Sequence, residues 1–307
     1  MRRKCLDMVT ALARRDPRVV FVGSDLGHGT LADFRREMPE RFFMEGISEG
    51  HVLGLAAGLA LEGFVVYVNT IATFLTRRAY EQAVLDLGLH NLPVRLIGNG
   101  GGLVYAPLGP THLATEDLTT FRAIPNMAVI CPADATEMER FMPQTLDWPG
   151  PIYIRLGKGH DPVVTPPGAP FVIGRGQLLR PVGRVLLVTT GVCLGPVLEA
   201  ADLLGAGGIV AGVLHLPTVK PLDAELLRQA MAQARAVVTV EENTILGGLG
   251  GAVAEVLAEA DFPQAKRFRR MGLPDVFPDC YGTQKGLWQR YGLTPAAIRD
   301  TAAGIAE

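Results

Sequence analysis

Short runs of apolar, mostly β-branched residues alternate along the first half of the chain with longer segments of helical periodicity. Runs that are apolar at every position are typical of strands buried on both faces, and such strands, when helices separate them, form parallel sheets. Five runs are predicted strands, namely residues 19–22, 65–68, 94–97, 127–130 and 152–154. The pattern therefore predicts an α/β domain over residues 1–156.

The alternation stops after this region and then restarts. Residues 157–171 are rich in proline and glycine, which deny the backbone regular structure, so we interpret them as a linker. Further apolar runs follow at residues 185–188, 209–214 and 236–240, each with a helical segment after it. The predicted fold class is α/β with two doubly wound domains, the second one smaller and spanning residues 172–307.

Composition narrows the partners that the protein can have. Hydrophobic residues make up 48% of the chain and the mean hydropathy is +0.24. This is more apolar than a single soluble domain needs and indicates subunit interfaces, while no apolar run reaches the length of a membrane span. A net charge of −2 gives no electrostatic basis for binding nucleic acid or an anionic membrane. We therefore expect protein subunits and small molecules as partners.

The cysteines indicate a reducing compartment. Four of them are spread along the chain without a CxxC pair, so the sequence predicts neither a zinc site nor a disulfide framework. The basic first residues are not followed by a long apolar stretch, and we expect no signal peptide. A cytoplasmic location fits these features best.

Glu49 is an acidic residue at the start of an apolar helical segment rich in small residues. A carboxyl held in a protein-built pocket can share or donate a proton at neutral pH, which makes Glu49 a candidate catalytic group. A structural interpretation stands beside it. Ser48 can cap the helix by accepting a backbone N–H, and an acid in the first turn complements the positive end of the helix dipole.

A glycine-rich turn follows the first predicted strand and contains Asp25 and His28. The turn has neither the lysine of a P-loop nor the Gly-x-Gly-x-x-Gly spacing of a dinucleotide site. Asp25 is therefore either a turn former or a polar contact to a ligand, and His28 is a weaker candidate for such a contact.

An aromatic residue, Phe74, comes shortly after the strand predicted at residues 65–68. It is either a core residue or an aromatic face that stacks on a flat heterocycle at the strand end. The charged residues that follow, Arg77, Arg78 and Glu81, are interpreted as surface ion pairs.

The long segment at residues 99–117 is rich in glycine and contains one histidine. Packing alone does not call for such a loop, so we predict an active-site loop. His112 is the strongest candidate in the chain for a proton carrier or an oxyanion partner. The residues after it are interpreted as a helix cap and first-turn acids, namely Thr115, Glu116 and Asp117.

Arg155 ends the strand predicted at residues 152–154. Its planar fork of donors suits a phosphate or a carboxylate, and an interface salt bridge fits the position equally well. In the second domain, Glu241 and Glu242 precede a glycine-rich turn at residues 247–251, and both fit tight turn packing better than chemistry.

The order of these segments resembles the C-terminal half of transketolase, together with the matching parts of deoxyxylulose phosphate synthase and the β subunits of 2-oxo acid dehydrogenases, which use thiamine diphosphate. The motifs are Gly-Ile-Ser-Glu-Gly-His at 46–51, Thr-Phe-Leu-Thr-Arg-Arg-Ala-Tyr-Glu-Gln at 73–82, Gly-Pro-Thr-His at 109–112, Val-Glu-Glu-Asn at 240–243 and Tyr-Gly-Leu-Thr at 291–294. The resemblance implies a pyrimidine-binding domain at residues 1–156 and a transketolase C-terminal domain at residues 172–307.

The same resemblance implies roles for the candidate residues. Glu49 would hydrogen-bond a ring nitrogen of the cofactor's aminopyrimidine and relay a proton, while Phe74 would stack on that ring. Asp25 would approach the cofactor from the first strand end. The residues implied to contact substrate are His112, which also takes part in catalysis, Arg155, Arg3 and His28.

Two positions depart from the typical transketolase pattern. Leu108 stands where an acidic residue contacts a donor hydroxyl, and glycines around Gly100 stand where a substrate histidine is expected. A site that loses hydroxyl partners changes its preferred substrate, so ordinary pentose phosphates are not expected. The alternatives are a 2-oxo acid dehydrogenase β subunit or pyruvate-using synthase, and a regulatory or scaffolding subunit without activity.

Transketolase-type enzymes hold magnesium and the cofactor's diphosphate with a Gly-Asp-Gly motif and a later asparagine. The chain contains no Gly-Asp-Gly, and we predict no metal ligands in it. The resemblance therefore implies one subunit of a split transketolase. A partner corresponding to the N-terminal, diphosphate-binding half would supply the Mg²⁺ ligands, and two such pairs would form an α2β2 assembly.

Overall fold

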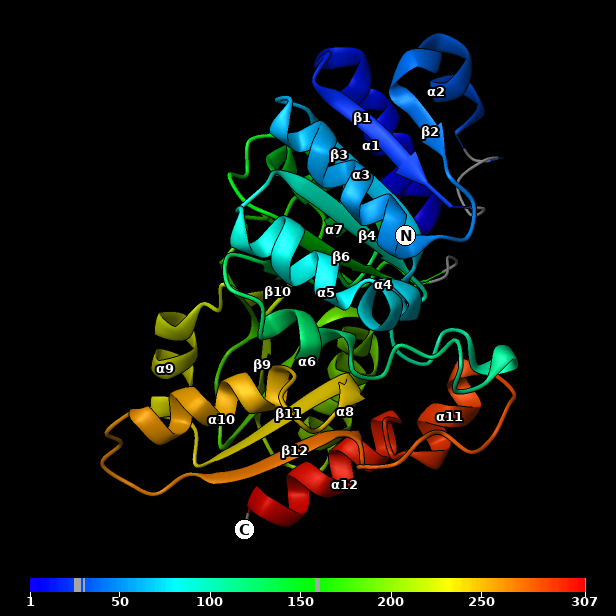
Figure 1. The fold of residues 1–307 in the computed structure, drawn as a ribbon. Helices are drawn as coiled ribbons and strands as arrows, with labels where there is room; N and C mark the ends of the chain where they lie inside the picture. Colours follow the sequence, from blue (N-terminus) through cyan, green and yellow to red (C-terminus); the bar gives the residue numbers. More distant parts are fainter. Residues whose placement is uncertain (25–28, 30, 158–160, 307) are drawn as a thin grey trace.

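Two sheets covered by helices form the molecule, with the first domain above the second in Figure 1. The structure is a computed structural model that describes residues 1–24, 29, 31–157 and 161–306. The first sheet has the strand order β10-β5-β6-β4-β3-β1-β2 and is parallel except for β10. Its strands are β1 (Val19–Gly23), β2 (Phe42–Met44), β3 (Val65–Ile71), β4 (Val94–Asn99), β5 (Ala128–Ile130), β6 (Ile152–Leu156) and β10 (Thr218–Lys220). The predicted parallel sheet is confirmed.

Helices cover both faces of this sheet because both faces of its central strands are apolar. One face packs against α1 (Arg2–Arg15) and α7 (Ala135–Phe141), and the other against α3 (Glu49–Leu61), α6 (Asp117–Arg122) and a π-helical segment (Ala83–Leu89). The remaining helices of this domain are α2 (Ala32–Glu37), α4 (Ala72–Arg78) and α5 (Tyr80–Gln82).

The second sheet has the order β12-β11-β8-β9-β7 and is parallel except for β7. Its strands are β7 (Gln177–Arg180), β8 (Val185–Thr189), β9 (Ala211–His215), β11 (Ala236–Thr244) and β12 (Arg267–Leu273). Its helices are α8 (Leu194–Ala206), α9 (Ala224–Gln233), α10 (Leu249–Glu259), α11 (Gln284–Arg290) and α12 (Pro295–Ala306). Among the described helices of both domains, none is long and apolar enough to cross a membrane.

The two sheets are tied together by segments that cross between them. Strand β10, which comes after the predicted linker, pairs antiparallel with β5 and so joins the first sheet. Asp134, before α7, accepts hydrogen bonds from the backbone N–H groups of Val164 and Thr165, at 2.8 and 2.7 Å. Residues 161–176 form neither helix nor strand. The boundaries at 156 and 172 stay a prediction, and these contacts show the domains packed closely together.

Candidate active site

Glu49 is the first residue of α3, and its carboxylate is buried, with 3% of the residue exposed. Ser48 occupies the N-cap position but does not cap the helix, contrary to the structural interpretation, since its hydroxyl donates to the Glu45 carbonyl at 3.1 Å. The carboxylate instead faces Arg78 of α4, whose Nη1 lies 3.3 and 3.5 Å from its two oxygens. A buried anion therefore meets a half-exposed cation here.

Phe74 lies on the first turn of α4, which begins directly after β3. The next residue, Leu75, fills the core, whereas Phe74 stays partly exposed. The guanidinium carbon of Arg78 lies 3.9 Å from the Phe74 ring centroid, and the His112 ring centroid lies 5.3 Å away in an edge-to-face arrangement. The position favours the second sequence interpretation, an available aromatic face, over a core residue.

His112 belongs to a loop that returns from the end of β4 to the start of α6. Gly100 has a φ of +72°, and a Cβ there would overlap the Tyr105 ring, so only glycine fits the start of this loop. The Thr111 hydroxyl and His112 Nδ1 lie 2.9 Å apart. The loop thus brings an imidazole beside Phe74, so the structure gathers Glu49, Phe74 and His112 in one place.

Arg77 fixes this loop from α4, although its sequence context suggested a surface residue. It donates to the carbonyls of Pro110 and Leu113, at 3.0 and 3.1 Å, and pairs with Glu116. The segments that flank His112 on either side are thereby held to the helix that carries Phe74. Sequence spacing gave no signal for this contact, because the partners are 33 to 39 residues away.

Arg77→Ala is expected to speed amide hydrogen exchange in the His112 loop about tenfold, because several hydrogen bonds from one charged group are lost. The amides to follow are those of His112 and Leu113, which bond the Gly109 carbonyl. Arg78→Ala is the matched control, since Arg78 contacts Glu49 and the Phe74 ring rather than the loop carbonyls. Equal exchange rates in wild type and Arg77→Ala would show that the loop is held by other contacts.

Arg155 and Asp117 form a buried ion pair at the domain junction, with Nε and Oδ2 2.8 Å apart. Arg155 also donates to the carbonyls of Ala114 and Glu242. Burial opposes the charge on Arg155, but the nearby Asp117 carboxylate raises the pKa of Arg155 overall. Of the two sequence interpretations, this geometry favours the interface salt bridge. Asp117 accordingly serves as more than the first-turn acid that the sequence suggested.

The remaining candidates lie outside this cluster or outside the described residues. Arg3 is highly exposed on α1, and its Nε is 3.9 Å from Asp7. Asp25 and His28 belong to the residues that the structure does not describe. Their proposed contacts with cofactor and substrate therefore stay predictions.

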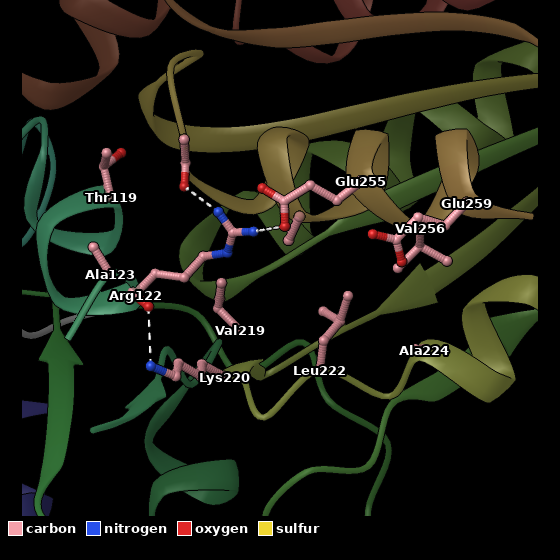
Figure 2. Close-up of a pocket in the computed structure, with 12 residues that line it drawn as sticks. Thr119, Arg122, Ala123, Val219, Lys220, Leu222, Ala224, Glu255, Val256 and Glu259 are labelled. Atoms are coloured by element: carbon pink, nitrogen blue, oxygen red, sulfur yellow. Dashed lines mark hydrogen bonds and ion pairs between the residues drawn. The ribbon is translucent and has the colours of Figure 1, made fainter. Parts of the chain in front are cut away.

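A cavity of about 590 Å³ lies at the junction of α6, β10 and α10, apart from the Glu49 cluster. Figure 2 shows its charged side chains turned toward internal partners. Arg122 donates to the Gly247 carbonyl and pairs with Glu255, and the Lys220 amine donates to main-chain carbonyls of α6 and the turn after it. Burial lowers the pKa of Lys220. This cavity supports the packing of the two domains.

Comparison with known families agrees with this architecture. Residues 1–162 match the family described as "Transketolase, pyrimidine binding domain", and residues 174–298 match "Transketolase, C-terminal domain". This chain belongs to the transketolase family. The resemblance inferred from the motifs is confirmed. Transketolases and 1-deoxy-D-xylulose-5-phosphate synthases use thiamine diphosphate.

Individual transketolase relatives are similar over nearly the whole chain. A putative uncharacterized transketolase family protein of Sinorhizobium fredii is 40% identical, covering 94% of this chain and 84% of the relative. One of the subunits of apulose-4-phosphate transketolase from Phocaeicola vulgatus is 33% identical over 98% of this chain and 96% of its own. A solved split gene transketolase, an inactive beta4 tetramer, has a TM-score of 0.90 at 35% identity and is covered to 99%, with 100% of this chain. The chain spans about half the length of the 1-deoxy-D-xylulose-5-phosphate synthases that it matches.

Proposed function

We propose that this chain is the pyrimidine-binding and C-terminal subunit of a split, thiamine-diphosphate-dependent transketolase. The enzyme transfers a two-carbon ketol or acyl unit from a ketose or 2-oxo donor to an aldehyde acceptor. Bound thiamine diphosphate supplies the electron sink that lets a carbon–carbon bond next to a carbonyl break. The observation that carries the proposal is the buried Glu49 carboxylate beside the partly exposed face of Phe74, with His112 next to that ring.

The space between Glu49 and Phe74 fits an aminopyrimidine. In the structure the flat guanidinium of Arg78 stacks on the Phe74 ring and donates to the Glu49 carboxylate. A flat group with N–H donors is therefore compatible with both side chains at once. An aminopyrimidine has the same two properties, a planar face and hydrogen-bonding nitrogens on its edge.

Each residue of the cluster has a definite task in this proposal. Glu49 holds and exchanges a proton at a ring nitrogen of the pyrimidine, and its burial strengthens that hydrogen bond. Phe74 orients the ring by stacking. His112, on the loop anchored by Arg77, contacts substrate oxygens or carries their protons. Asp25, on the cofactor, and His28, on the substrate, complete the proposed contacts.

A second subunit is part of the proposal, because this chain has no Gly-Asp-Gly to hold magnesium and diphosphate. Relatives covered over almost their full length are named as transketolase subunits, which supports the split arrangement. Gly54 and Gly58 lie exposed on α3, where an added Cβ would meet no atom within 4 Å. This open face beside Glu49 suits close packing of another helix, and we propose an α2β2 assembly. The free cysteines fit a cytoplasmic location.

The substrate differs from ordinary pentose phosphates in this proposal. Leu108 is 48% exposed on the His112 loop and offers no hydroxyl partner. Arg155 is committed to Asp117 and to main-chain carbonyls, so a sugar phosphate would need other cations, of which Arg3 is one candidate. A donor that lacks the usual hydroxyl or phosphate pattern suits this loop best.

The test is reconstitution with a subunit that contains Gly-Asp-Gly and a following asparagine. The two chains should co-purify, bind thiamine diphosphate with Mg²⁺, and transfer a two-carbon unit from a ketose to an aldehyde. Parallel assays with a ketose phosphate and with pyruvate separate ketol from acyl transfer. Oxidative decarboxylation that feeds a lipoyl carrier, without ketol transfer, would assign the chain to the 2-oxo acid dehydrogenases instead.

A further inference from the structure

Arg78 occupies the place that the proposed function assigns to the cofactor's aminopyrimidine. Its guanidinium carbon is 3.9 Å from the Phe74 centroid, and its Nη1 is 3.3 Å from Glu49 Oε2. The two partners are the same carboxylate and the same aromatic face that a pyrimidine needs. A guanidinium and a pyrimidine ring cannot both stack on this face of Phe74.

The helix geometry explains why Arg78 lies there. Phe74 and Arg78 are four residues apart on α4, so their side chains share one face of the helix. Glu49 comes from α3, which contacts α4, and its carboxylate is 3% exposed. A buried carboxylate without a partner is costly, and the adjacent guanidinium is the compensating charge. The neighbouring Arg77 points to the His112 loop instead and does not compete for this place.

We infer that Arg78 is a displaceable placeholder that keeps Glu49 and Phe74 occupied until thiamine diphosphate binds. The inference rests on the proposed function and deepens it. Cofactor binding then exchanges one pair of contacts for another: the Arg78 side chain, half-exposed already, turns to solvent, and the pyrimidine takes over Glu49 and Phe74. The placeholder lowers cofactor affinity by the free energy of the contacts that must be broken.

Cofactor affinity, rather than activity, tests this inference. In the complex reconstituted with the diphosphate-domain subunit, Arg78→Ala is expected to bind thiamine diphosphate about 3- to 30-fold more tightly than wild type, as loss of one exposed cation–π contact and one ion pair implies. Isothermal titration calorimetry gives the Kd, and the cofactor-induced rise in melting temperature should be larger for the variant. Arg78→Lys, which keeps the charge but cannot stack as a flat group, should fall between the two.

Arg36→Ala, on α2, is the matched control, because its side chain is 68% exposed and it removes the same charge away from the cluster. Its cofactor affinity should equal that of wild type. An Arg78→Ala affinity equal to or weaker than that of wild type overturns the placeholder while leaving the proposed function in place. Failure of wild type and all variants to bind thiamine diphosphate overturns the proposed function itself, and the placeholder with it.

Discussion

Glu49→Gln, in the complex with the diphosphate-domain subunit, is expected to lower kcat by about 10²- to 10⁴-fold, the range typical of losing a general acid–base group. The amide has nearly the size of the carboxyl and still forms hydrogen bonds, but it cannot take up and release a proton. Assembly should survive, because the ion-pair partner of Glu49 is the half-exposed Arg78, which water can solvate in its place. The measurements are the rate of ketol transfer, the elution volume of the complex and its melting temperature.

Glu45→Gln provides the matched control, since Glu45 lies four residues earlier and its side chain faces His51 at 3.4 Å rather than the Phe74 ring. It removes the same charge, and turnover should stay at the wild-type value. Unchanged turnover in Glu49→Gln would contradict the catalytic role and support the scaffolding alternative. Loss of assembly together with turnover would contradict the expectation that Glu49 acts only in the chemistry.

Buried strands were predictable from sequence because every position of β1, β8 and the first five residues of β11 is apolar or otherwise suited to a strand interior. Four strands, β2, β7, β10 and β12, were not predicted. The edge strand β12, with three arginines and mostly exposed or half-exposed residues, has no hydrophobic run to detect. Strand β10 has three residues and forms by pairing with β5, which lies about 90 residues earlier in the chain, so local pattern could not indicate it.

The candidate site was predictable where a residue's place in its own segment was decisive. Glu49 at a helix start, Phe74 after a strand and His112 in a long glycine-rich loop all come together as the parallel topology implies. The role of Arg78 was missed because i,i+4 spacing suggested only a surface pair, whereas its partner Glu49 comes from another helix, 29 residues earlier. Charge pairing across elements is set by tertiary packing, which spacing alone does not encode.

Asp117→Ala is expected to destabilise the chain by about 3–5 kcal/mol, because it leaves the guanidinium of Arg155 buried without a counter-charge. Asp117 is fully buried and Arg155 is 5% exposed. The same carboxylate also accepts a hydrogen bond from the Tyr153 hydroxyl at 2.6 Å, so one substitution removes a partner from two neighbouring side chains of β6. Burial raises the pKa of Asp117, and the Arg155 charge opposes that shift. The urea unfolding midpoint at neutral pH measures the loss.

Two comparisons separate the unpaired charge from simple loss of packing. Glu37→Ala removes the partner of Arg14 in an exposed pair and should leave the unfolding midpoint unchanged. The double variant Asp117→Leu with Arg155→Met replaces both charges by apolar groups, and it should regain much of the stability lost in Asp117→Ala. If the double variant is no more stable than Asp117→Ala, the main-chain bonds from Arg155 to Ala114 and Glu242, rather than its charge, hold this junction together.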